Sequence, residues 1–228
     1  MPRKISRVNR IDRAFIKEII CTTNLTEEIS EDDQAEMAIP SYLHNNPMIR
    51  AIFWRRYDLL YEMFRLQPEM VVCEFGCGLG AFLPTLAEDT AKVYAVDLFP
   101  QYAKALAEKL DLPVEFSTSL DTIPDGSLDV IYAAEVLEHL DDLPAGIRLI
   151  GRKLKPDGRL IMSGPTENTI YKIGRFLVGY NKYHEYHRNN VYEIKRQILK
   201  NGFSLERTIH FPNRMILLNL ICSFQVNK

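Results

Sequence analysis

The chain has 228 residues, which is enough for one sizeable domain that carries a short extension. Apolar residues (AVILMFWYC) make up 46% and charged residues 25%, an ordinary mix for a folded domain, so disorder of the whole chain is excluded. Twenty-eight Lys and Arg against 30 Asp and Glu give a formal charge of -2. Because no net positive charge attracts phosphate groups, we expect no nucleic-acid partner.

The four cysteines, Cys21, Cys73, Cys77 and Cys222, are too few and too scattered for a disulfide framework. They are typical of a reducing compartment, so we predict a cytoplasmic protein. Cys73 and Cys77 lack a second pair or a nearby His that would complete a zinc site, so we expect two small core residues and no metal. The apolar stretches fall short of the ~20 residues of a membrane-spanning helix, and no secretory signal opens the chain. We therefore expect no stable membrane insertion.

The beginning of the chain separates its charges by sign. Residues 1–20 carry six basic and two acidic side chains, whereas residues 21–40 carry six acidic and no basic ones. We expect this stretch to be an extension ahead of the core. Its opposed charges could pair with each other, but solvation is the favoured interpretation. The predicted division is an N-terminal extension and cap helix over 1–66 and a core domain over 67–228.

Apolar side chains recur at helical spacing from Met48 to Leu66 and predict an amphipathic helix. Arg50, Arg55 and Arg56 lie between them. They are a local candidate for a basic groove, but a solvated helix face is the favoured interpretation.

After Pro68, short apolar runs alternate with segments of helical periodicity, which is typical of βαβ units. The runs are almost continuously apolar, so they predict strands of a parallel sheet that is covered on both faces. A turn at Lys155–Gly158 should precede the fifth strand. The expected strands are 70–75, 93–97, 114–117, 128–133 and 159–163, and the expected helices are 81–87, 101–110 and 143–154.

The last part of the chain completes the sheet. A helical stretch near 166–178 and a polar loop lead to a helix at 191–200 and two final strands at 203–211 and 215–226. Only a few residues separate these strands, so they should form an antiparallel hairpin. We predict one doubly wound α/β domain with a seven-stranded, mostly parallel sheet behind an N-terminal helical cap.

A glycine-rich turn follows the first predicted strand. Glu74 precedes Gly76, Gly78 and Gly80, and the glycines allow tight turning and close approach of the backbone to a ligand. The glycines alone could equally belong to a dinucleotide-binding fingerprint. However, a phosphate-binding turn gains nothing from a carboxylate at Glu74, whereas a ligand with a cationic group would gain.

These residues resemble the first motif of the class I S-adenosylmethionine-dependent methyltransferases, an acidic residue and one spacer before Gly-x-Gly-x-Gly. Further motifs follow in the family's order, so the resemblance, to the small-molecule, type 11-like branch, extends from Glu74 to Gly202. It implies a Rossmann-like sheet of strand order 3-2-1-4-5-7-6 and S-adenosyl-L-methionine as the cofactor. It also implies that Glu74, Gly76, Gly78 and Gly80 bind this cofactor.

A carboxylate, Asp97, ends the second predicted strand, 21 residues after Gly76. In the family, the carboxylate at this position accepts hydrogen bonds from both ribose hydroxyls, and its acceptor geometry suits a vicinal diol. A helix cap ahead of Pro100 is the weaker alternative.

Three more residues enter the cofactor site by resemblance. Leu98 would lie against the adenine, and Ser119 and Leu120 follow the third strand, where the family contacts the base. The family usually has Asp at the position of Ser119. A Ser hydroxyl can still accept a hydrogen bond, and Asp121 is the alternative for this contact.

Two regions supply candidate catalytic residues. Glu138 and His139 match the Glu-His-Leu sequence of small-molecule members, which lies near the methyl-transfer face, although a satisfied structural histidine is the alternative. The polar stretch Tyr183–Arg188 predicts a lid over the substrate, with His184 and His187 as candidate bases. Their spacing of three and the lack of a third ligand argue against zinc.

We therefore expect an S-adenosylmethionine-dependent methyltransferase that acts on a small-molecule acceptor and works mainly by alignment. Two alternatives remain. The glycine turn and Asp97 alone would fit an NAD-dependent oxidoreductase, which Glu74 and the Glu138-His139 pair disfavour. A non-catalytic scaffold that binds S-adenosylmethionine is the other. The acceptor, the methylated atom and the oligomeric state stay open.

Overall fold

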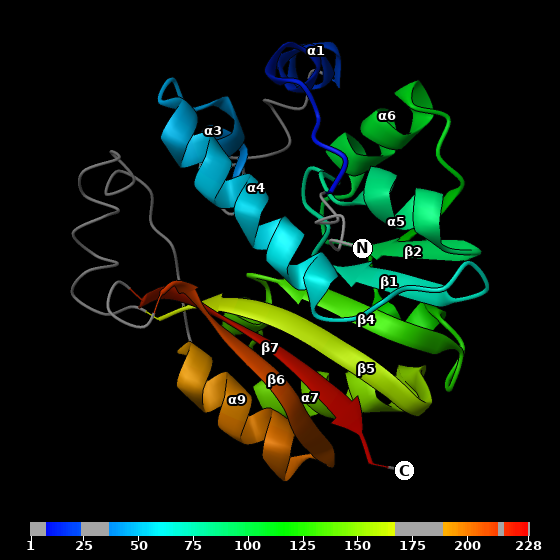
Figure 1. Cartoon of the computed structure of the whole chain (residues 1–228). Coiled ribbons are helices and arrows are strands. Elements are labelled where there is room, and N and C mark those ends of the chain that lie inside the picture. Colours follow the sequence, from blue (N-terminus) through cyan, green and yellow to red (C-terminus); the bar gives the residue numbers. More distant parts are fainter. Residues whose placement is uncertain (1–7, 24–36, 167–188, 214–216, 228) are drawn as a thin grey trace, which may run out of the picture.

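The computed structural model describes residues 8–23, 37–166, 189–213 and 217–227. At its centre lies a seven-stranded sheet in the order β3-β2-β1-β4-β5-β7-β6, with helices on both faces (Figure 1). This order and architecture confirm the predicted fold. The strands are β1 (Val71–Phe75), β2 (Lys92–Val96), β3 (Val114–Ser117), β4 (Leu128–Ala134), β5 (Leu154–Pro165), β6 (Phe203–Pro212) and β7 (Leu217–Val226).

The strands β1 to β5 pair in parallel, whereas β7 runs antiparallel to both of its neighbours, β5 and β6. The last two strands are therefore the predicted hairpin. Because parallel strands end at a common edge, the carboxyl ends of β1, β2 and β4 bring Phe75, Val96 and Ala134 together. The sites of open α/β sheets lie at such an edge.

The two faces of the sheet carry separate apolar cores, since successive side chains of a strand point to opposite sides. Val72 of β1 belongs to the core shared with α4, α5 and α6, and Cys73 belongs to the core shared with α7 and α9 (Figure 1). Burial on both faces explains the continuous apolar runs. These helices are α4 (Pro47–Glu62), α5 (Leu83–Asp89), α6 (Gln101–Lys109), α7 (Leu143–Lys153) and α9 (Val191–Lys200).

Three of these helices begin at a side chain that accepts backbone hydrogen bonds. Asn46 caps α4, Asp142 caps α7 and Asn190 caps α9. A proline in the first turn of α4 and of α7 adds a fixed backbone angle at a position whose N–H has no helical partner. The observed starts lie at or next to the predicted ones.

The fifth strand differs from the prediction. β5 begins at Leu154, whereas the predicted strand began at Arg159. Leu154 pairs with Leu128 and Arg159 pairs with Val130, so the residues between them form an irregularity in the strand. Asp157 has a φ of 63° there, which shows that the expected turn is present inside the strand.

The extension is helical in two places that the sequence analysis did not predict. They are α1 (Arg13–Thr23) and α3 (Ile39–Leu43), and α1 packs beside α6. Ile16 and Ile19 of α1 are 1% and 0% exposed. The many charges of this stretch hide the apolar pattern in its sequence. Ile16 and Ile19 are three residues apart, so the helix places both on one face.

A buried carboxylate of α4 joins the beginning of the extension to the cap helix. Asp58 is 1% exposed and accepts the Val8 backbone N–H at 3.0 Å, and Arg10 forms an ion pair with it at 3.0 Å. The expectation of fully solvated charges is therefore wrong for Arg10, because a buried carboxylate needs partners.

Two further findings concern the predicted segments. Among the described residues, no helix has the length and apolar character needed to cross a membrane. The helix predicted near 166–178 lies outside the described residues except for Thr166, and the predicted lid at Tyr183–Arg188 lies outside them entirely.

Candidate functional site

A cavity of about 270 Å³ lies at the carboxyl ends of β1, β2 and β4. The cap closes its other side with Met37, Ala38 and residues of α3 and α4. Five of the predicted site residues contribute to its wall. They are Gly76, Gly78, Asp97, Leu98 and His139.

The glycine turn wraps around the end of β2. Gly76 and Cys77 donate their backbone N–H groups to the Val96 carbonyl at 2.7 and 3.2 Å, and Gly80 donates to the Cys77 carbonyl at 2.7 Å. All three glycines have positive φ, at 75°, 50° and 78° for Gly76, Gly78 and Gly80. Other residues adopt such angles at a cost, which explains the glycines.

The space beside each glycine differs. A Cβ at Gly76 would lie 2.5 Å from Cγ2 of Val136, and one at Gly80 would lie 2.9 Å from Cδ1 of Leu83. The atoms nearest to a Cβ at Gly78 would belong to Met37, the closest at 3.4 Å, which is an ordinary contact. Gly76 and Gly80 are therefore required by packing, whereas Gly78 faces the cavity between the turn and the cap.

Asp97 holds both loops that meet at the cavity. Its Oδ2 accepts the Gly78 N–H at 2.7 Å and its Oδ1 accepts the Phe99 N–H at 2.9 Å. A carboxylate has about four acceptor sites, so each oxygen can still accept a hydroxyl from a ligand. Leu98, beside it, is 75% exposed although it lines the cavity. This apolar side chain is available to a flat ring.

Glu74 lies behind the glycine turn and is 1% exposed. Neither carboxylate oxygen has a hydrogen-bond partner among the described residues. Burial and, next, the charge of Asp97 raise the pKa of Glu74 well above its ordinary value, and Arg56 opposes the shift. A buried, unpaired carboxylate costs free energy, so this group is suited to a ligand cation.

Arg56 is the residue that the sequence analysis placed wrongly, on a solvated face. It is 7% exposed and lines the cavity, with its guanidinium 5.2 Å from the Phe53 ring and 5.4 Å from the Tyr57 ring. Tyr57 stacks on Phe82 of the core at 5.0 Å, which turns this side of α4 inward. Arg55, by contrast, is half-exposed and pairs with Glu62 at 2.9 Å.

The charge of Arg56 is held by carboxylates across the cavity. Burial opposes the charge, but Glu135 and other neighbours raise the pKa of Arg56 above its ordinary value. The nearest approach to Glu135 is 3.8 Å, and the Arg56 Nε has no hydrogen-bond partner among the described residues. The guanidinium can therefore take an anionic group of a ligand.

Glu135 stands in an unusual backbone conformation at the end of β4. Its φ is 53°, which strains a residue with a side chain, and its N–H donates to the Ser163 carbonyl at 3.1 Å. Asn219 of β7 donates to its Oε2 at 2.9 Å, while its Oε1 has no partner among the described residues. The strained turn directs this carboxylate into the cavity wall.

His139 lies on the same loop, in a short 3-10 turn from Leu137 to His139. It lines the cavity, while Glu138 beside it is 0% exposed. The His139 backbone N–H donates to the Val136 carbonyl at 3.1 Å. His139 therefore lines the cavity on the loop that follows β4.

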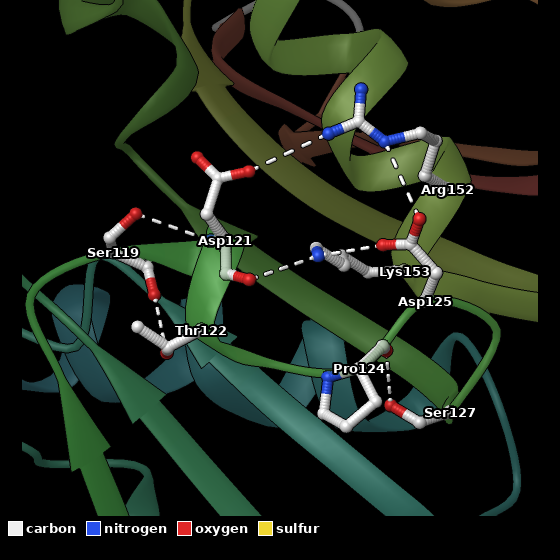
Figure 2. A network of polar contacts seen from close by, with 8 residues as sticks. All are labelled: Ser119, Asp121, Thr122, Pro124, Asp125, Ser127, Arg152 and Lys153. Carbon is white, nitrogen blue, oxygen red and sulfur yellow. Dashed lines mark hydrogen bonds and ion pairs between the residues drawn. The ribbon is translucent and has the colours of Figure 1, made fainter.

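Besides Glu74, which lies behind the glycine turn, three predicted residues lie near the cavity without lining it. Gly80 packs inside the turn, and Leu120 is 2% exposed in the second core. The Ser119 hydroxyl accepts the Asp121 N–H at 3.2 Å and caps the turn that follows (Figure 2). Thr118, which the sequence analysis did not select, lines the cavity instead.

The remaining predictions concern two histidines, metal binding and Cys77. His184 and His187 lie outside the described residues. Across the described ranges, no cluster of three or more His, Cys, Asp or Glu could hold a metal. Burial, then Glu74, raises the pKa of the Cys77 thiol well above its ordinary value, so Cys77 is an apolar wall residue rather than a nucleophile.

The sheet order, the antiparallel final hairpin and the glycine turn beside an acidic strand end define the class I methyltransferase fold. The model of the methyltransferase domain family matches residues 48–215, from the cap helix to the final hairpin. The chain belongs to this methyltransferase family, and S-adenosylmethionine is the cofactor of its class. No finding supports the nicotinamide-dependent alternative.

Individual relatives agree with this assignment. Ubiquinone biosynthesis O-methyltransferase of Xanthomonas axonopodis pv. citri (strain 306) is 34% identical over 113 residues, 46% of this chain and 47% of the relative. Phosphoethanolamine N-methyltransferase 1 of Arabidopsis thaliana is 34% identical over 109 residues, 45% of this chain and 22% of the relative. The chain spans about half or less of the length of these relatives.

One solved structure shares the fold over most of the chain. It is the N-methyltransferase NodS from Bradyrhizobium japonicum in complex with S-adenosyl-L-homocysteine. The TM-score is 0.64 at 18% identity, and the match covers 87% of this chain and 100% of that one. At this identity the likeness concerns the fold alone.

Proposed function

We propose that this protein transfers the methyl group of S-adenosylmethionine to a small-molecule acceptor. The observation that carries the proposal is the arrangement of charged groups at one cavity and directly behind its glycine turn. A buried carboxylate without a partner, a buried guanidinium with a free Nε, and a carboxylate with spare acceptor sites surround the glycine turn. They are Glu74, Arg56 and Asp97.

This arrangement fits the polar groups of the cofactor. Its amino-acid end carries an ammonium, which suits the region of Glu74, and a carboxylate, which suits Arg56. Its ribose offers two hydroxyls that suit the oxygens of Asp97. Among the described residues that line the cavity, Arg56 is the one arginine or lysine, so the carboxylate has a single place.

The cofactor supplies an activated methyl group on a sulfonium, so the protein needs to align the acceptor and to remove a proton where the acceptor is a hydroxyl or an ammonium. Glu135 and His139 are the described candidates for this task, because both line the cavity beside the end of β4. His184 and His187 stay proposals for the same task.

We assign different roles to the two parts of the chain. Residues 1–66 act as the cap, which contributes Met37, Tyr42 and Arg56 to the cavity, and residues 67–228 act as the core, which contributes the glycine turn and Asp97. A cytoplasmic location is also proposed, since Cys21, Cys73, Cys77 and Cys222 are all free thiols.

The test is transfer of a labelled methyl group. The names of the relatives suggest two acceptor panels, hydroxylated aromatic compounds and amino alcohol phosphates, offered with S-adenosylmethionine and purified protein. We expect one panel to yield labelled product and Asp97→Ala to abolish most of it. Tight binding of S-adenosylhomocysteine without transfer to either panel would instead favour the non-catalytic scaffold.

A further inference from the structure

The connection from β3 to β4, residues 118–127, is fastened to the end of α7 by polar contacts (Figure 2). We call this segment the crossover. Its first residue, Thr118, lines the cavity, and the Gly126 and Ser127 N–H groups donate to the Arg152 and Lys153 carbonyls at 2.8 and 3.0 Å. The crossover therefore joins the cavity wall to the opposite end of the sheet.

Lys153 pins the middle of the crossover. Its side chain is 5% exposed, and its ammonium donates to the Asp121 carbonyl at 3.2 Å and to Oδ1 of Asp125 at 2.7 Å. One acceptor is a main-chain oxygen, so the contact fixes the backbone itself and not only a side chain. Figure 2 shows the Lys153 side chain lying between these two partners.

Stability alone does not explain this lysine. Removing an ammonium from water is costly, and its acidic partner, Asp125, is 59% exposed, so the ion pair gains little. Lys153 stands in the last turn of α7, and an apolar side chain could occupy this buried position. The distinctive result of the lysine is a fixed crossover.

The fixed part is connected to the cofactor-binding edge by hydrogen bonds. The Ser119 carbonyl accepts the hydroxyls of Ser117 and Thr122, both at 2.9 Å. The Ser117 carbonyl in turn accepts the Asp97 N–H at 3.1 Å. A displacement of the crossover at Asp121 would thus reach Thr118 and the residue proposed to hold the ribose.

The last part of the cofactor to be placed is the nucleoside base. The proposed function places the amino-acid end at Arg56 and Glu74 and the ribose at Asp97. The wall residues that follow β2 and β3 are Leu98 and Phe99, next to Asp97 in the sequence, and Thr118. The crossover supplies Thr118 to this part of the wall, which we assign to the base.

We infer that Lys153 is a positioning residue that sets the selectivity of this protein for the base of its nucleoside cofactor, because it fixes the crossover beside Asp97. The inference rests on the proposed function. It assigns Lys153 no contact with the ligand, and it concerns recognition of a 6-aminopurine over a 6-oxopurine.

The experiment compares Lys153→Met with Lys155→Met. Lys155 is a matched control, since its ammonium also forms an ion pair at 2.7 Å, with Asp129, but Asp129 fastens the Val71 N–H at the start of β1 rather than the crossover. Calorimetry measures the affinity of each variant for S-adenosylhomocysteine and for S-inosylhomocysteine. Hydrogen exchange of residues 118–127 is measured without ligand.

We expect Lys153→Met to reduce the preference for the adenine compound about fivefold, which corresponds to about 1 kcal/mol, and to speed exchange in the crossover. Lys155→Met should change neither. Unchanged preference in folded Lys153→Met would overturn the inference, whatever the exchange rate. Should that variant fail to fold, Asp125→Ala removes the carboxylate contact of Lys153 from the exposed side, and an unchanged preference there would equally overturn it.

The two levels of the proposal fail in different ways. Wild-type protein that binds neither nucleoside would refute the proposed function. Wild-type protein that binds S-adenosylhomocysteine selectively, with the same selectivity in Lys153→Met, would refute only the role of Lys153.

Discussion

Two polar regions of the molecule differ in how their groups are satisfied. In the crossover and the end of α7, the Lys153 ammonium and the Ser119, Thr122 and Ser127 hydroxyls all have partners within the chain (Figure 2). At the cavity, one nitrogen of Arg56 and one oxygen of Glu135 have none among the described residues, and the same holds for both oxygens of Glu74 behind the glycine turn.

We interpret this difference as one between polar groups that stabilise the structure and polar groups that are available to a ligand. Buried polar groups in folded proteins are paired, and a cluster of exceptions needs an explanation. Arg56 and Glu135 line one cavity, Glu74 lies behind its glycine turn, and the three groups are of opposite charge type, which is what a zwitterionic ligand requires. Under the proposed function, the unpaired cluster receives the ligand and the paired network positions the wall.

The largest expected effect comes from the glycine turn. Gly76→Ala should destabilise the fold by about 2–4 kcal/mol, because its Cβ would meet Val136 at 2.5 Å and the residue would adopt a strained φ. Gly78→Ala should lose only about 1 kcal/mol, from strain alone. Urea denaturation of both variants measures the difference, and equal losses would contradict the packing described for the turn.

The next effect concerns binding rather than folding. Asp97→Ala should weaken the affinity for S-adenosylhomocysteine by about 1–3 kcal/mol, because a charged acceptor of the ribose hydroxyls is removed. The variant also frees the Gly78 and Phe99 N–H groups, so Asp97→Asn, which keeps one oxygen, should lose less. Calorimetry that shows wild-type affinity in both variants would remove Asp97 from the site.

The parts of this structure that the sequence predicts are those that local patterns of residues encode. The strands and the core helices were predictable, because burial on one or two faces is a local pattern of apolar residues. The glycine turn and Asp97 were also predictable, since their spacing along the chain reflects a strand end, a turn and the next strand end.

Arg56 was not predictable from its helix, where it stands with two other arginines. Its burial depends on Tyr57 stacking against Phe82 and on Glu135 across the cavity, which are contacts between distant parts of the chain. Glu135 gives no local signal either, because a positive φ at a non-glycine residue is imposed by its surroundings.

A smaller effect is the pH dependence that Glu74 imposes on the free protein. Burial and the charge of Asp97 raise the pKa of Glu74. Below the ordinary carboxyl pKa of about 4.3 the group is protonated in both the folded and the unfolded protein, so the folded protein has its full stability there. That stability is lost as the pH rises through the raised pKa. Glu74→Gln should therefore flatten the fall in melting temperature between pH 5 and 8, and an identical slope in both proteins would contradict the assignment.

The smallest effect belongs to the exposed part of the crossover network. Arg152 approaches Asp121 and Asp125 at 3.5 and 3.7 Å, and all three side chains are more than half exposed. Arg152→Ala should change the free energy of unfolding by no more than about 0.5 kcal/mol. A loss as large as that of Gly76→Ala would show that this surface pair, and not Lys153, carries the network.

The central claim is that the unpaired charged groups at the cavity and behind its glycine turn receive S-adenosylmethionine, and thermal unfolding with two ligands tests it most directly. S-adenosylhomocysteine at 100 times its dissociation constant should stabilise the protein by about 2.7 kcal/mol. NAD should not, since it offers no ammonium to Glu74 and no carboxylate to Arg56. Stabilisation by NAD together with no effect of S-adenosylhomocysteine would contradict the account.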